Sequence, residues 1–147
     1  MGLRVWLPLN GSLENQGLAT VTTTNDGATS NTSGKIGNCY SFNGSSKITN
    51  AFYHSVTSAI GSLTCWVKFN ALPASNAWYS LIQVGNLGGF ATCRLGLYVE
   101  HGAGLNISIN GSSTNANYTA CSITSNVWYH ICATFDGAVV TVYLDGN

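Results

Sequence analysis

The amino-acid sequence predicts an all-β fold, a two-sheet antiparallel β-sandwich of the jelly-roll kind. Apolar and polar residues alternate over segments of about five to eight residues, the pattern of a strand with one buried face. Turn-forming groups such as NDG, NGSS and HGAG separate these segments, and no apolar stripe of helical period exceeds two turns. Strands every ~8 to 12 residues without helices favour a sandwich or jelly roll, with a barrel as the open alternative.

The clearest alternation lies in SLTCWVKF (62–69), where Leu63, Cys65 and Val67 share one face and Thr64 and Trp66 the other. The last 20 residues, 128–147, predict two strands around an Asp136-Gly137 turn, because Gly accepts the positive φ that a tight hairpin needs. A short turn of helix is a weaker expectation at 53–62, and the polar stretch 15–35 is expected to be a long excursion. The other predicted strands are 3–9, 21–23, 78–85, 94–99 and 105–110.

Composition excludes several classes of function. The 147 residues are enough for one domain with one core, and five Lys and Arg balance five Asp and Glu. A neutral chain has no electrostatic footprint for nucleic acid or an anionic membrane, so neither is an expected partner. No apolar run approaches ~18 residues. The first residues lack the apolar region of a signal peptide, so no signal peptide is expected in this chain.

The five cysteines do not predict a metal site, because none of them forms a C-x-x-C pair. Cys39, Cys65 and Cys132 lie in apolar strand patterns and are predicted to be buried reduced thiols that act as small hydrophobic side chains. A disulfide between Cys93 and Cys121 is the alternative.

Four segments carry a resemblance to a known family: VWLPLNGSLENQG at 5–17, GKIGNCYSFNGSSKI at 34–48, SLTCWVKF at 62–69 and WYHICATFDGAVVTVYLDG at 128–146. In this order they resemble the laminin-G-like, concanavalin-A-like lectin/glucanase jelly-roll family over nearly the whole chain. The last segment is the most specific. The resemblance implies a concanavalin-A-like jelly roll. The sequence of the first segment, 5–17, is similar to segments of bacteriophage structural proteins of gut Firmicutes.

The resemblance also implies that 1–147 is a single laminin-G-like domain truncated at its C-terminal end. Members of the family continue beyond this hairpin with further strands, the last of which pairs near the N-terminal strand. The edge beside the predicted strand 3–9 is then uncovered, and an uncovered edge is a template for pairing. A neighbouring chain, a swapped segment or a homo-oligomer contact is expected to cover it.

Hydrolysis is not expected, although some relatives are glucanases. Glycoside hydrolysis needs two carboxylates flanking the scissile bond, and no two acidic residues alternate within one predicted strand. A long-range pair of Glu100 with Glu14 stays open. His130 matches a family position that resembles a structural residue, and it is predicted to form a hydrogen bond inside the sheet. His54 and His101 are predicted to be solvated loop residues.

Calcium is a candidate cofactor, because related lectins often hold Ca²⁺ at the rim of the sandwich. Ca²⁺ binds six to eight oxygen atoms from carboxylates, amides and backbone carbonyls. With few acidic residues in the chain, Asn10, Asn43 and Asp145 are the candidate ligands. The alternative is that all three are turn residues.

Sugar binding is the leading functional prediction. A loop aromatic ring beside an amide suits a sugar, which presents apolar C–H faces and hydroxyl groups. Three loops carry such groups. The candidate residues are Asn76, Trp78 and Tyr79 in 73–80, Asn117 and Tyr118 in 113–119, and Tyr53 in 50–54. The alternative for Trp78 is that it begins the following strand and packs in the core.

The sequence therefore predicts a non-catalytic carbohydrate-binding or adhesion module. The expected setting is a phage tail or surface protein that recognises bacterial glycans, on a virion surface or outside the cell. The alternative is a structural virion or filament subunit that binds neighbouring chains through its sheet edges.

Overall fold

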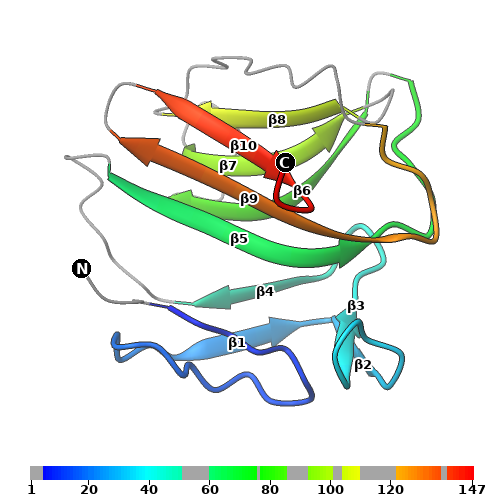
Figure 1. Ribbon diagram of the computed structural model, residues 1–147. Coiled ribbons are helices and arrows are strands. Elements are labelled where there is room, and N and C mark those ends of the chain that lie inside the picture. Colours follow the sequence, from blue (N-terminus) through cyan, green and yellow to red (C-terminus); the bar gives the residue numbers. More distant parts are fainter. Residues whose placement is uncertain are drawn as a thin grey trace. The chain divides into compact units, whose positions relative to one another are not determined.

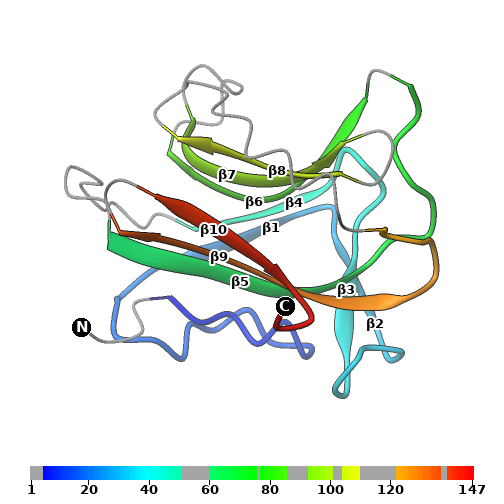
Figure 2. The same cartoon turned by 45° about the horizontal axis from the view of Figure 1, so that its top comes forward.

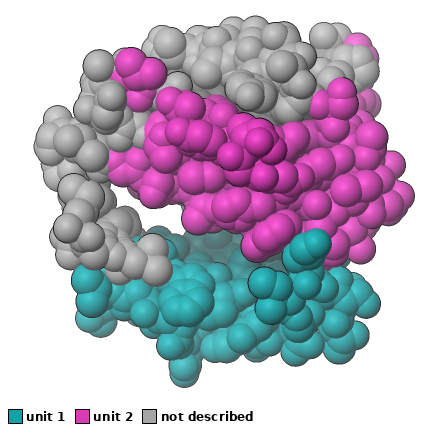
Figure 3. Space-filling model, viewed as in Figure 1, with its two compact units in different colours: residues 1–54 teal, residues 55–147 magenta. Residues whose placement is uncertain are grey.

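The computed structural model describes residues 5–50, 60–75, 77–85, 93–100, 104–109, 122–136 and 139–147. All regular structure in these ranges is β (Figure 1), as the sequence predicts. The chain falls into two compact units, residues 1–54 and residues 55–147 (Figure 3), and each unit is described by itself. The described part of the chain holds no helix long and apolar enough to cross a membrane.

The first unit contains two pairs of short strands. Strands β1 (Thr23–Asp26) and β4 (Lys47–Asn50) pair antiparallel, as do β2 (Thr29–Asn31) and β3 (Cys39–Ser41). The Asn25 side chain accepts a hydrogen bond from the Ala28 N–H at 2.8 Å and donates one to the Ala28 carbonyl at 2.8 Å, which fixes the β1–β2 turn. The expected strand at 21–23 is thus displaced: pairing begins at Thr23 and extends to Asp26.

The prediction of a strand over 3–9 is wrong for residues 5–9, which the structure describes without strand pairing. The backbone N–H and carbonyl of Trp6 form hydrogen bonds with residues 15 and 16 and not with a neighbouring strand. Its N–H donates to Asn15 Oδ1 at 2.6 Å, and its carbonyl accepts from the Gln16 N–H at 2.8 Å. Pro8 has no N–H to give to a ladder, and Leu9 has a positive φ of 53°. Local turn chemistry overrides the alternation of apolar residues here.

The second unit is built from two three-stranded antiparallel sheets (Figures 1 and 2). One sheet has the order β10-β9-β5 and the other β6-β7-β8. All four neighbouring strand pairs in these sheets are antiparallel. The strands are β5 (Ile60–Lys68), β6 (Trp78–Gly85), β7 (Cys93–Glu100), β8 (Gly104–Ile109), β9 (Trp128–Asp136) and β10 (Val140–Leu144).

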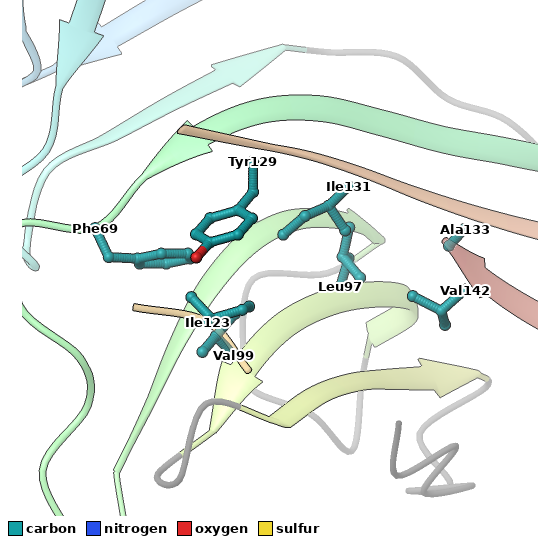
Figure 4. Packing of buried hydrophobic residues seen from close by; sticks show 8 residues of the cluster. All are labelled: Phe69, Leu97, Val99, Ile123, Tyr129, Ile131, Ala133 and Val142. Atoms are coloured by element: carbon teal, nitrogen blue, oxygen red, sulfur yellow. The ribbon is translucent and has the colours of Figure 1, made fainter. Parts of the chain in front are cut away.

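The core of the second unit lies between these two sheets (Figure 4). Leu97 and Val99 of β7 and Ile131 of β9 are its largest fully buried side chains, and each contributes about 1.5–3 kcal/mol by leaving water. The predicted alternation of strand 62–69 is confirmed, because Leu63, Cys65 and Val67 pack against the core from β5. The rest of the buried cluster is Phe69, Ile123, Tyr129, Ala133 and Val142.

The C-terminal hairpin is confirmed in its strands. Phe135 pairs with Val140 at one end of the hairpin and Ile131 with Leu144 at the other. Gly137, the second residue of the predicted turn, lies outside the described residues. Of the weak helical turn predicted at 53–62, residues 53–59 also lie outside them, and the prediction is wrong for 60–62, which belong to β5 and pair with β9.

Candidate functional site

The β10-β9-β5 sheet has an outer face, opposite the core, that carries aromatic and polar side chains. Tyr129, Ile131 and Ala133 of β9 point into the core, so the residues that alternate with them point the other way. Antiparallel pairing sets Trp66 opposite His130 and Lys68 opposite Trp128. We define the outer face by its central residues, Thr64, Trp66, Lys68, Trp128 and His130.

Trp66 and His130 are neighbours across β5 and β9. Their ring centroids are 5.1 Å apart, with an interplanar angle of 47°. The indole of Trp66 remains 45% exposed. Thr64 Oγ1 lies 2.7 Å from His130 Nε2, a hydrogen bond in which either group can be the donor. The prediction that His130 forms a hydrogen bond inside the sheet is confirmed, and the bond holds its imidazole beside an exposed indole.

Lys68 and Trp128 form the next pair along the outer face. The Lys68 ammonium lies over the Trp128 ring, with Nζ 5.5 Å from the ring centroid, within the range of a cation–π interaction. Asp26–Lys47 is the only Asp/Glu–Lys/Arg ion pair among the described residues, so no described carboxylate pairs with Lys68. One ring face of Trp128 is therefore covered by a cation that has no described anionic partner.

Asp145 fixes the end of the hairpin next to His130. Its Oδ1 accepts a hydrogen bond from the His130 N–H at 2.8 Å, and its own N–H donates to the His130 carbonyl at 2.9 Å. Asp145 and Gly146 both have positive φ, 52° and 87°, and Leu144 and Asn147 exchange two backbone hydrogen bonds of 2.9 and 3.1 Å. These are the features of a two-residue type I′ turn. Asp145 therefore has the role of a turn residue.

Two of the predicted sugar-binding residues, Trp78 and Tyr79, lie at the start of β6. Trp78 is 51% exposed, so its packing in the core, the alternative reading, is wrong. The Tyr79 ring stacks on the core residue Phe69, with centroids 6.5 Å apart and an interplanar angle of 18°. Adjacent residues of a strand point to opposite faces. Trp78 and Tyr79 therefore do not form one stacking surface.

The other predicted sugar-binding residues lie outside the described residues. They are Tyr53, Asn76, Asn117 and Tyr118. The loop groups proposed from the sequence stay predictions.

The candidate calcium ligands lie in different units, Asn10 and Asn43 in residues 1–54 and Asp145 in residues 55–147. Asn43 Oδ1 accepts hydrogen bonds from the Ser45 N–H, the Ser46 N–H and the Ser45 hydroxyl, at 3.0, 2.9 and 3.0 Å. That oxygen therefore closes a turn. Asn10 is exposed. Across the described ranges no three His, Cys, Asp or Glu side chains gather as metal ligands would, and a calcium site remains a prediction.

The acidic side chains that the structure describes have local roles. Asp26 Oδ2 lies 3.3 Å from Lys47 Nζ, and Asp145 closes its turn. Glu14 is exposed. The side chains of Glu100 and Asp136 lie outside the described set, so a pairing of Glu100 with Glu14 is untested.

Cys39, Cys65 and Cys132 are free thiols, but all three are half-buried instead of buried. The cause for Cys132 is its place on β9: it alternates with the core residues Ile131 and Ala133 and so points outward. Burial, with a smaller contribution from Cys132, raises the pKa of the Cys65 thiol from 9.0 to about 12. Cys121 of the alternative disulfide lies outside the described residues.

Sequence reasoning missed Trp66, Lys68 and Trp128 as candidate site residues, although a signal was present. Alternation already sets Trp66 and Lys68 on the face opposite Leu63, Cys65 and Val67. The missing information was the strand register, which pairs Trp66 with His130 and Lys68 with Trp128. The pairing of two strands far apart in the chain cannot be predicted from the sequence of either strand alone.

The fold and this surface define the class of protein: an antiparallel β-sandwich with an aromatic outer sheet face. The model of the concanavalin A-like lectin/glucanases superfamily, in its laminin G-like branch, matches residues 41–147, and the chain belongs to this family. Comparison with curated proteins and with solved structures returned no significant match. The superfamily fits a carbohydrate-binding or adhesion module.

Proposed function

We propose that this protein is a non-catalytic carbohydrate-binding module and that the outer face of its β10-β9-β5 sheet binds the sugar. The observation that carries this proposal is the half-exposed indole of Trp66 beside the hydrogen-bonded imidazole of His130. An indole offers a large rigid apolar surface to the C–H face of a sugar ring. Membership of a superfamily of lectins and glucanases supports the same class of ligand.

The polar groups around Trp66 suit sugar hydroxyls. Thr64 and His130 share one hydrogen bond, and each has further donor or acceptor capacity. A sheet face fixes these groups more rigidly than loops do, because β5 is paired along its whole length with β9. Rigid positioning reduces the entropy lost on binding.

The proposal excludes catalysis because the outer face has no pair of described carboxylates. Retaining and inverting glycosidases need two such groups about 5–9.5 Å apart. Asp145 lies near His130, but its Oδ1 accepts the His130 N–H. A test with soluble β-glucans and reducing-end detection would contradict this part of the proposal if product accumulated with time.

The proposed biological setting is adhesion to bacterial surface glycans by a phage tail or extracellular surface protein. This setting depends on the similarity of segment 5–17 to phage structural proteins. Homo-oligomer contacts at an N-terminal edge strand have less support, since residues 5–9 do not form that strand.

The direct test is binding of the purified chain to a panel of bacterial surface polysaccharides and storage glucans. Saturable binding of at least one glycan by a chain with a β-type circular dichroism spectrum is the expected result. Each measurement is repeated with calcium and with a chelator, which decides whether the predicted metal takes part. Absence of binding across the panel would favour the structural-subunit alternative.

A further inference from the structure

We infer that the sugar bound at Trp66 is anionic and that its carboxylate or sulfate group binds the ammonium of Lys68. The inference rests on the proposed function and narrows its ligand to acidic polysaccharides. Three observations support it: the charge of the outer face, the cover over Trp128, and the spacing of Trp66 and Lys68.

The charge of the outer face is the first observation. Lys68 is the only Lys, Arg, Asp or Glu among the outward positions of β5, β9 and β10 whose side chains the structure describes. The other outward positions with described side chains are Ser62, Thr64, Trp66, Trp128, His130, Cys132, Thr134, Thr141 and Tyr143. Asp136 lies at an outward register position at the opposite end of β9 from Trp128, the residue paired with Lys68. Asp145 follows the last strand, and its Oδ1 accepts the His130 N–H. Lys68 has no described ion-pair partner, so the potential close to its ammonium is positive.

The cover over Trp128 is the second observation. A neutral sugar that stacks on this face of the Trp128 ring must displace the Lys68 ammonium, which lies 5.5 Å from the ring centroid. An anionic group can instead bind the Lys68 ammonium without displacing it from the Trp128 ring, because the ammonium has three hydrogen-bond donors. The geometry therefore discriminates against a neutral ring and in favour of an anion at this position.

The spacing of Trp66 and Lys68 is the third observation. They are two residues apart on β5 and share its outward face, so their Cα atoms are ~7 Å apart. A sugar ring stacked on Trp66 can thus direct a ring substituent toward Lys68, whose flexible stem adjusts its reach. A charge-assisted hydrogen bond between ammonium and anion is about twice as strong as a neutral one.

The test uses two matched pairs of polymers that differ in charge. Polygalacturonate is compared with its fully methyl-esterified form, and dextran sulfate with dextran, by isothermal titration calorimetry. The charged member of at least one pair should bind about tenfold more tightly at low salt. That preference should fall markedly at 0.5 M NaCl, since salt screens exposed charges. The two pairs distinguish a carboxylate from a sulfate ligand.

Lys68→Gln should reduce binding of the preferred charged polymer about tenfold and so remove its preference over the neutral member of the pair. Lys68→Arg should retain the preference. The matched control is Lys47→Gln, an exposed lysine of the first unit that pairs with Asp26, and it should have no effect. If Lys68→Gln does not fold, the wild-type comparison of charged and neutral polymers decides.

Equal affinity for both members of each pair would overturn the inference and leave carbohydrate binding standing. A charge preference that Lys68→Gln leaves intact would also overturn it, because the anion would then bind elsewhere. Failure of the folded chain to bind these four polymers would overturn the inference, while binding of other glycans in the panel would separately preserve the proposed function.

Discussion

Asp145 and His130 join the end of β10 to β9 through two hydrogen bonds. The His130 N–H donates to Asp145 Oδ1 at 2.8 Å, and the Asp145 N–H donates to the His130 carbonyl at 2.9 Å. The same His130 carries the imidazole that lies 5.1 Å from the Trp66 ring. The turn that follows β10 therefore fixes the backbone of a residue of the candidate sugar site.

Replacement of Asp145 by Ala should lower the free energy of unfolding by about 1–2 kcal/mol. The change removes the acceptor of the His130 N–H and leaves a residue with a Cβ and no side-chain hydrogen bond at positive φ. Asp145→Asn is the matched control, because Asn keeps an oxygen acceptor and tolerates this backbone conformation. Urea unfolding followed by tryptophan fluorescence measures both variants. Equal losses for Ala and Asn would show that the side-chain hydrogen bond has no stabilising role.

Truncation of a core residue should cost more than truncation on the solvent side of the same hairpin. Ile131 is fully buried between the two sheets of the second unit, so Ile131→Ala should destabilise the protein by about 2–5 kcal/mol. Thr141 is exposed on β10, and Thr141→Ala should cost less than about 1 kcal/mol. Chemical denaturation compares the two. Similar losses would contradict the assignment of inward and outward faces.

Cys65 should make the protein less stable as pH rises above 9. Its thiol has a pKa of about 12 in the folded chain against 9.0 without burial, so between these values the unfolded state loses its proton while the folded state retains it. The unfolded state then binds fewer protons, and the free energy of unfolding decreases with pH in this window. Below pH 9 the group has no such effect. Denaturation at pH 8 and pH 10.5 should show a smaller decrease for Cys65→Ala than for the wild type, and identical decreases would contradict the assignment.

The fold could be predicted because the alternation of strands such as 62–69 reports directly which face is buried. Confirmation came from Leu63, Cys65 and Val67 in β5 and from Val142 and Leu144 in β10, which pack in or against the core. The failure at 5–9 has a local cause. The Asn15 side chain accepts a hydrogen bond from the Trp6 N–H. The alternation of apolar residues does not reveal a hydrogen bond to a side chain nine residues away.

The candidate site was less predictable than the fold. Trp78 and Tyr79 were proposed together as loop residues, yet they open a strand and so point to opposite faces. Trp66 is a candidate site residue only because of its register with His130, 64 positions further along the chain. Long-range pairing of this kind depends on the whole sheet and is not encoded in either strand alone.

The central claim is that Trp66, on the outer face of the β10-β9-β5 sheet, contacts the sugar. It is tested most directly by titrating the tightest-binding glycan of the panel into the wild type, Trp66→Ala and Trp78→Ala. Both indoles are about half exposed, 45% and 51%, so the two variants remove similar surface. Trp66→Ala should weaken binding about tenfold or more, and Trp78→Ala should change it less than about twofold. Unchanged affinity of a folded Trp66→Ala protein, with loss in Trp78→Ala, would contradict the account and move the site to the start of β6.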